Sequence, residues 1–302
     1  MSSARKIKKI FKSKPTIEGA GVHLKRAFGF YQVPFLDPFL LLDDFHSDNP
    51  ADYIKGFPWH PHRGIETVTY MLLGKVEHGD SMGNKGIIHS GDVQWMTAGS
   101  GIIHQEMPKG QKDGLMWGFQ LWANLPASHK MMDPRYRDVK SDQIPEVPLG
   151  KGVKAKIICG EVNGVKGPVQ GIVTGPEYLD FIVPSKSIFE YPVKEGHTVL
   201  AYVVEGQGYF DQGRDSYACE VEGENYFDFK RECLIGPENL ILYGDGDGVV
   251  ISTEDTQVRF LLMSGKPIKE PVAWYGPIVM NNQEELRIAF QEYQEGTFIK
   301  RK

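Results

Sequence analysis

The sequence predicts an all-β protein made of two related antiparallel β-barrels in tandem, with a short helix at the C-terminus. Three observations support this fold class. Short apolar runs rich in Val, Ile, Tyr and Phe recur along the chain, 34 glycines and 19 prolines are spread between them, and one glycine spacing occurs twice. Short strands separated by frequent turn residues are typical of sandwiches and barrels rather than helical folds.

The strands are predicted from apolar runs bounded by turn residues. Clear examples are residues 67–73, 154–159, 178–183, 198–204 and 258–263. Near the N-terminus, residues 5–14 alternate basic with apolar side chains, which predicts a first strand with one solvated face rather than a nucleic-acid or membrane patch.

The C-terminal helix is predicted over about residues 282–295. Asn282 can cap its N-terminus, Glu285 completes a capping box, and Gly296 ends it. Its apolar face is formed by Leu286, Ala289, Phe290 and Tyr293. We expect this amphipathic helix to cover a barrel and to have no chemical role.

The repeated glycine spacing predicts that the two barrels are related. Gly64 and Gly74 are separated like Gly196 and Gly206, with apolar residues between each pair. A charged segment with several prolines lies between the repeats and predicts a linker. The expected division is an N-terminal metal-binding domain at 1–131, a linker at 132–152 and a C-terminal domain without a metal site at 153–302.

Composition excludes several classes of function. The formal charge of −5 gives no overall positive field for a phosphate backbone, so direct nucleic-acid binding is not expected. No apolar stretch is long enough to span a bilayer, and the N-terminus lacks a secretion signal. The three cysteines, Cys159, Cys219 and Cys233, form no C-x-x-C pair. We therefore expect a cytoplasmic protein without a membrane partner, and a monomer.

The most informative residues are two pairs of metal-ligand type. His60 and His62 are two positions apart, and so are His104 and Glu106 further along. Alternate residues of a β-strand point to the same face, so each pair can converge on one point. Two neighbouring strands would then supply four ligands. Pro61 cannot donate to a ladder, so its strand is expected to be bulged, frayed or at a sheet edge.

The ligand set favours a divalent first-row metal. Three neutral imidazoles and one carboxylate suit iron(II), with nickel, copper, zinc, manganese and cobalt as alternatives, and are poor for calcium or magnesium. Four protein ligands in an octahedral shell leave two positions for a substrate oxygen or dioxygen, which favours catalysis. The alternative is that His60 and His62 end a loop while His104 and Glu106 make surface hydrogen bonds. The second pair favours the metal site.

Longer motifs around these residues resemble the pirin family of cupins. They are residues 37–45 (DPFLLLDDF), 60–64 (HPHRG), 66–70 (ETVTY), 91–99 (GDVQWMTAG) and 276–281 (GPIVMN). The resemblance implies a bicupin of two jelly-roll barrels, with one non-haem metal, commonly iron, in the N-terminal barrel. It implies His60, His62, His104 and Glu106 as metal ligands. Glu66 occupies a ligand position of the general cupin pattern, but the resemblance implies a supporting or structural role here.

The second barrel is expected to lack a metal. The glycine offset carries His60, His62 and Glu66 onto Pro192, Lys194 and Thr198, and the nearby His197 is alone. Three other histidines, His78, His89 and His129, are expected at the surface or behind the ligands. A further set is expected at the barrel mouth or in the core: Trp95, Met96, Trp117, Phe119, Gln120 and Trp122.

The resemblance to pirins implies two classes of function. One is an oxidoreductase that incorporates dioxygen, a quercetin 2,3-dioxygenase with a small aromatic or flavonol-like substrate. In it the substrate hydroxyl ionises at the metal, and Glu106 is both ligand and catalytic base. The other is a non-enzymatic regulator that binds a transcription factor or a metabolic enzyme. Oxygenation of another enol or phenol would use the same site, and the sequence leaves these alternatives open.

Overall fold

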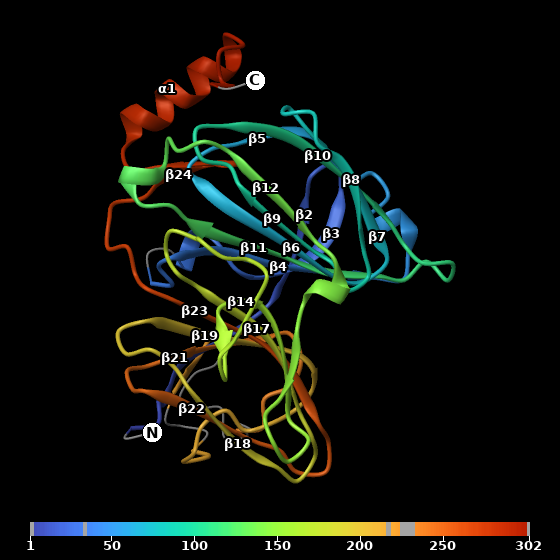
Figure 1. Cartoon of the computed structure of the whole chain (residues 1–302), viewed down its shortest axis with the longest axis vertical. Helices are drawn as coiled ribbons and strands as arrows, with labels where there is room; N and C mark the ends of the chain where they lie inside the picture. The colour runs from blue at the N-terminus through green and yellow to red at the C-terminus, as the bar shows by residue number, and fades with distance from the viewer. Residues whose placement is uncertain (1–2, 33–34, 216–218, 224–232, 301–302) are drawn as a thin grey trace. The chain divides into compact units, whose positions relative to one another are not determined.

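The computed structural model describes residues 3–32, 35–215, 219–223 and 233–300 (Figure 1). Contacts divide the chain into two units: a packed unit, Met1–Ser13 with Ile144–Pro267, and a histidine unit, Lys14–Gln143 with Ile268–Lys302. This division differs from the boundaries 1–131, 132–152 and 153–302 expected from the sequence. The difference arises because the first residues pair into the sheet of the packed unit, whereas the last residues pack on the histidine unit.

The histidine unit is a sandwich of two antiparallel sheets. The larger sheet has the order β12-β9-β6-β11-β4-β3-β2, and the smaller has the order β5-β10-β7-β8. Their bounds are β2 Lys14–Glu18, β3 Val22–Phe28, β4 Phe39–Ser47, β5 Phe57–His62, β6 Ile65–Leu73, β7 Lys75–Asp80, β8 Lys85–His89, β9 Val93–Thr97, β10 Ile102–Lys109, β11 Met116–Asn124 and β12 Arg135–Val139. The two sheets do not join into a closed hydrogen-bonded barrel, and the arrangement is the jelly-roll type of cupin fold.

The packed unit repeats the strand order of the larger sheet. Its main sheet reads β1-β21-β19-β23-β17-β14-β13, with β20 beyond β1, and β18 pairs with β22 separately. The bounds are β1 Ile7–Lys12, β13 Glu146–Pro148, β14 Lys154–Cys159, β15 Glu161–Val162, β16 Val165–Lys166, β17 Glu177–Val183, β18 Ile188–Pro192, β19 Thr198–Gly206, β20 Glu220–Val221, β21 Asn239–Tyr243, β22 Gly248–Ser252 and β23 Val258–Gly265. The shared order supports the duplication predicted from the glycines.

Short 3-10 turns and the C-terminal segment complete the chain. The turns are η1 Phe30–Gln32, η2 Pro50–Asp52, η3 Ala127–His129 and η4 Ser141–Gln143, and the segment contains β24 Ala273–Tyr275, β25 Ile278–Met280 and α1 Gln283–Gln294. The side chain of Asn282 accepts from Glu285 N at 2.9 Å, as the predicted cap requires. The Glu285 carboxylate accepts in return from the backbone N–H of Asn281. Within the described residues, no helix combines the length and the apolar character needed to cross a bilayer.

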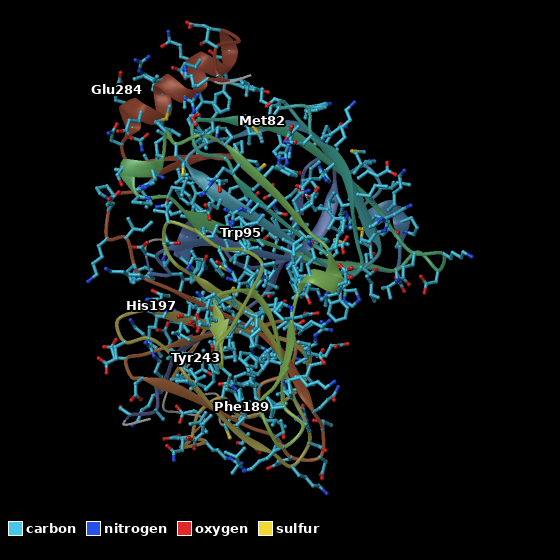
Figure 2. All side chains as sticks on the ribbon, viewed as in Figure 1. Met82, Trp95, Phe189, His197, Tyr243 and Glu284 are labelled. Carbon is cyan, nitrogen blue, oxygen red and sulfur yellow. The ribbon has the colours of Figure 1, made fainter. Side chains whose placement is uncertain are left out.

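Aromatic side chains fill the interior of the packed unit. Phe260 stacks on Phe181 with ring centroids 5.3 Å apart and meets Phe210 edge-on at 5.2 Å. Phe189 and Tyr243 also lie among the strands of this unit, as Figure 2 shows. These ring contacts add to the stabilisation that comes from buried apolar area. The rings and their neighbours fill the interior of the packed unit.

Candidate metal centre

Strands β5 and β10 carry the predicted ligands and are direct neighbours. They pair antiparallel with His104 opposite His60 and with Ile102 opposite His62. The i, i+2 spacing therefore places the histidines on one face, as the sequence predicts. Strand β5 lies at the edge of its sheet, where the missing N–H of Pro61 is tolerated. The register also shifts here, because His104 pairs with His60 and Glu106 pairs with Phe57, so the extra residue lies in β5 between Phe57 and His60.

The three imidazoles meet at one point. One ring nitrogen each of His60, His62 and His104 lies within 4.8 Å of the others, and the two Nε2 atoms of His60 and His62 are 3.0 Å apart. His62 is 2% exposed and His104 is 1% exposed. Burial lowers the pKa of both imidazoles well below the usual range, and neighbouring histidines lower it further. Both are therefore neutral at pH 7, as ligation requires.

The hydrogen bonds around these rings fit a metal ion. Nδ1 of His60 lies 2.8 Å from Pro58 O, and Nδ1 of His62 lies 3.1 Å from Pro277 O. A carbonyl oxygen only accepts, so each Nδ1 carries a proton. In the neutral ring of His62, Nε2 therefore presents a lone pair toward Nε2 of His60. Both ring nitrogens of His104 are buried without a partner among the described residues, so a cation would satisfy all three rings.

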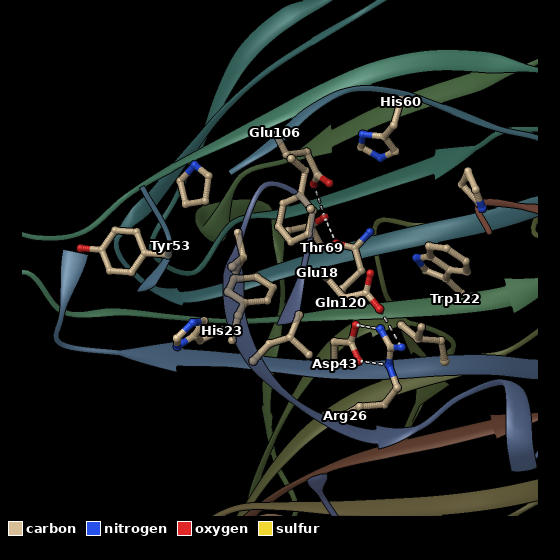
Figure 3. Close-up of a pocket in the computed structure, with 18 of the residues that line it drawn as sticks. Glu18, His23, Arg26, Asp43, Tyr53, His60, Thr69, Glu106, Gln120 and Trp122 are labelled. Carbon is tan, nitrogen blue, oxygen red and sulfur yellow. Dashed lines mark hydrogen bonds and ion pairs between the residues drawn. The ribbon is translucent and has the colours of Figure 1, made fainter. Parts of the chain in front are cut away.

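The carboxylate of Glu106 lies beside this cluster on the same cavity as His60 (Figure 3). It is buried, and its Oε1 accepts from the hydroxyl of Thr69 at 3.0 Å. Burial raises the pKa of Glu106, whereas His60 and the Thr69 hydrogen bond lower it. Glu106 is not part of the group of ligand atoms that meet within 4.8 Å, which contains the three imidazoles. Its role as a ligand stays a prediction.

The carboxylate of Glu66 is held by other groups. It accepts from Trp95 Nε1 and from Thr97 Oγ1, each at 2.9 Å, on the larger sheet. Both oxygens are thus engaged in stabilising β6 and β9, in line with the structural role implied for it. His78 is buried rather than at the surface, with Nδ1 2.8 Å from the hydroxyl of Tyr136.

A large cavity opens beside the imidazoles. Its volume is about 730 Å³, within the range of roughly 300–1,000 Å³ typical of small-molecule sites. Both sheets and the C-terminal segment contribute to its wall, and the expected residues Gln120 and Trp122 line it. Trp95, Met96 and Phe119 are buried in the core instead. Trp122 packs against His62 with ring centroids 5.0 Å apart and against Trp274 at 6.0 Å.

Sequence reasoning missed the groups that hold the ligand strand from behind. Arg63 donates to Ser100 O, to Phe298 O and to the Glu292 carboxylate, each at 2.8 Å. Lys130 Nζ donates to Gly64 O at 2.9 Å and to Val279 O at 3.0 Å. Val279, Glu292 and Phe298 lie far from His60 and His62 in the chain, and Lys130 stood outside every motif recognised in the sequence.

The corresponding strands of the packed unit carry no such ligands. Pro192 pairs with Gly248 in the way that His60 pairs with His104. The four ligand positions therefore correspond to Pro192, Lys194, Gly248 and Val250, none of which is an imidazole or a carboxylate. His197 lies elsewhere, with Nδ1 3.0 Å from Ser264 Oγ.

Comparisons with known proteins agree with this architecture. Residues 21–123 match the family model Pirin, and residues 178–299 match the Pirin C-terminal cupin domain. A pirin-like protein of Caulobacter vibrioides is 42% identical over 97% of this chain and 99% of its own length. A crystal structure of quercetin 2,3-dioxygenase from Acinetobacter baumannii is 30% identical, with a TM-score of 0.85 over 98% of this chain and 99% of that one.

A more distant structure shares the fold. The bacterial pirin of Escherichia coli, solved in complex with nickel(II), is 18% identical, with a TM-score of 0.61 over 85% of this chain and 98% of that chain. The fold, the repeated strand order and the full-length match lead to one conclusion: this chain belongs to the pirin family.

Proposed function

We propose that this protein is a metal-dependent dioxygenase that oxidises a flavonol-like aromatic substrate, with quercetin 2,3-dioxygenase as the specific activity. The observation that carries the proposal is a cluster of three imidazoles, two of them buried and neutral, beside a cavity of about 730 Å³. The similarity to a quercetin 2,3-dioxygenase of Acinetobacter baumannii over nearly the whole chain supports it.

The imidazoles and Glu106 would hold the metal. A divalent first-row ion there would supply Lewis acidity toward a phenolic oxygen and the capacity to engage dioxygen. Iron as the resident ion and a cytoplasmic location remain predictions of the sequence. Elemental analysis of protein purified from its native host tests the first of these.

The cavity wall binds and orients an aromatic substrate. Trp122 and Trp274 present aromatic surface beside His62, against which a planar ring can pack. Glu106 would accept the proton of the substrate hydroxyl, because Thr69 fixes one of its oxygens and His60 lies on the same cavity. The apolar wall excludes water from the ionised substrate.

Oxygen uptake by iron-loaded protein with a panel of flavonols tests the proposal. We expect stoichiometric ring-opened product with at least one flavonol. Glu106→Gln should retain some metal and lose turnover, whereas His60→Ala should lose the metal first. Unchanged turnover in Glu106→Gln would remove its role as a base. Absence of oxygen uptake across the panel, together with capture of a specific transcription factor or metabolic enzyme, would favour the regulatory alternative.

A further inference from the structure

A group of three charged side chains lines the cavity on the larger sheet. Arg26 on β3 donates from Nε and Nη2 to the two carboxylate oxygens of Asp43 on β4, at 2.8 and 2.7 Å. Its Nη1 lies 2.9 Å from Glu18 Oε1 on β2. All three residues line the same cavity as His60. We call Glu18, Arg26 and Asp43 the charged trio.

The charged trio and the imidazoles lie on different walls. The trio belongs to the larger sheet, whereas His60 and His62 belong to the smaller one. Figure 3 shows His60 and Glu106 on one side of the cavity and Arg26 with Asp43 on the other, with Thr69 and Gln120 between them. A ligand that reaches the imidazoles can therefore extend toward the trio.

The Gln120 amide lies between the two ends. One end of it is 2.8 Å from Thr69 Oγ1, the hydroxyl that also contacts Glu106. Figure 3 shows the other end of this amide directed toward the space bounded by His60 and Trp122. A polar atom that faces an apolar cavity is suited to fixing the orientation of a ligand.

The charge of the trio selects what can bind there. One guanidinium faces two carboxylates, so the trio carries a net charge of −1 when both acids are ionised. Each carboxylate oxygen bound to Arg26 keeps a further lone pair, so the trio can accept hydrogen bonds from a ligand. It repels a carboxylate or phosphate. Phenolic hydroxyls fit these requirements because they donate and are neutral at pH 7.

A stabilising role for the trio accounts for only part of this arrangement. Arg26 and Asp43 are cross-strand partners, which explains their ion pair. Yet buried ion pairs rarely stabilise a fold more than apolar side chains do. The packed unit holds a similar trio, in which Arg259 donates to Asp180 at 3.0 and 2.7 Å and Glu205 lies 3.4 Å away. That second trio provides a matched control.

We propose that the charged trio sets substrate specificity by accepting hydrogen bonds from hydroxyl groups at the end of the substrate remote from the imidazoles. This inference rests on the proposed function and makes it narrower. The substrate class is an elongated aromatic compound with an ionisable hydroxyl at one end and a hydroxylated ring at the other. A flavonol whose outer phenyl ring carries vicinal hydroxyls fits this class.

The test compares two flavonols that differ only in the outer ring, which is 3′,4′-dihydroxylated in one and unsubstituted in the other. Turnover by iron-loaded protein gives kcat/KM, and quenching of tryptophan fluorescence in metal-free protein gives Kd. We expect the wild type to prefer the dihydroxylated compound about tenfold in both measurements, as one hydrogen bond to a charged group would give. Asp43→Asn should bring the ratio close to one, and Asp180→Asn should leave it unchanged.

A second variant keeps the test valid if Asp43→Asn folds poorly. Glu18→Gln alters a side chain that is 42% exposed and should reduce the preference about threefold. Absence of a preference in the wild type, binding of neither compound, or an unchanged ratio in both variants would overturn the inference. The binding measurement needs no turnover. A preference in Kd without oxygen uptake would therefore support the specificity role of the charged trio and contradict the dioxygenase activity. Turnover without a preference would support the dioxygenase activity and contradict the role of the trio.

Discussion

The two units share one strand order and differ in what occupies the space between their sheets. In the packed unit, rings such as Phe181, Phe210 and Phe260 fill that space. In the histidine unit the corresponding region holds a cavity bordered by imidazoles, a carboxylate and the charged trio. The jelly-roll framework therefore does not determine the site. A few inward-facing side chains on β5 and β10, and the side chains left small or polar opposite them, decide whether a unit can bind a ligand.

The units also share a way of attaching a terminal segment through a buried arginine. Arg5 belongs to the N-terminal segment and donates to carbonyl oxygens of the packed unit, including those of His197 and Gly246. Arg63 belongs to the body of the histidine unit and donates to the C-terminal segment at Glu292 and Phe298. Both arginines are 2% exposed. Only Arg63 is adjacent to a predicted metal ligand.

The largest expected effect concerns the imidazoles themselves. His104→Ala should lower metal affinity by more than roughly 100-fold, because it deletes a ring whose nitrogens have no other partner among the described residues. Loss of a residue that only supports a ligand typically costs roughly 10–100-fold. His197→Ala in the packed unit should leave metal binding unchanged. Titration of the purified variants with iron(II) or nickel(II) measures both. Equal metal affinity in the two variants would contradict the prediction that the histidine unit, and not the packed unit, binds the metal.

The next largest effect separates the two arginines. Arg63→Met should lower the free energy of unfolding by about 3 kcal/mol, since it removes the donor of two carbonyl oxygens and one of the two cationic partners of Glu292, which keeps Lys300. Arg5→Met should cost about 3 kcal/mol for its four carbonyl contacts. Urea denaturation measures both losses. Metal affinity should fall about tenfold in Arg63→Met alone; an equal fall in Arg5→Met would contradict a local role.

A smaller effect compares the glycines that revealed the duplication. Gly64 and Gly196 both adopt a positive φ, at 77° and 71°. A Cβ on Gly64 would overlap the carbonyl oxygen of Val279, whereas a Cβ on Gly196 would meet open space. Gly196→Ala should therefore cost only the backbone strain of about 1 kcal/mol, and Gly64→Ala should cost about 2–3 kcal/mol. Thermal unfolding of the two variants measures the difference. Equal losses of stability would show that the backbone at Val279 moves away from the new Cβ at no cost.

The smallest effect is a pH dependence of the charged trio. Burial raises the pKa of Asp43 from 3.8 to about 6, while Arg26 opposes this shift. The folded state thus holds this proton more tightly than the unfolded state does, so ionisation of Asp43 reduces stability as pH rises from about 4 to 7. The deficit of Asp43→Asn relative to the wild type should shrink over that range by on the order of 1 kcal/mol. A constant deficit from pH 4.5 to 7.5 in urea denaturation would refute this.

Much of what could be predicted from the sequence, such as strand faces and the helix cap, came from local patterns of residues. The i, i+2 spacing of His60 and His62 needs only a strand to place both rings on one face, and the Asn282 cap depends on residues three positions away. Such features are encoded within a few residues, so the chain's remote partners do not alter them. Pairing of β5 with β10 is a contact between distant segments, and it was expected only because the two ligand pairs need neighbouring strands.

Contacts between distant segments could not be predicted in this way. The alternation in residues 5–14 indicates a strand but contains no information about its partner, and β1 pairs with β21 in the packed unit. The contact of His62 with Pro277 O involves a backbone carbonyl, which has no signature in the side-chain sequence. The charged trio was missed because Arg26, Asp43 and Glu18 converge only through strand register.

The contribution of residues 268–302 to the histidine unit has a consequence for biosynthesis. During translation, His62 and Arg63 leave the ribosome long before Pro277 and Glu292 are made. The ring of His62 lacks its orienting carbonyl until then. Loading of the metal should therefore follow synthesis of residues 268–302, and a fragment ending at residue 143 should bind the ion weakly unless residues 268–302 are supplied as a separate peptide.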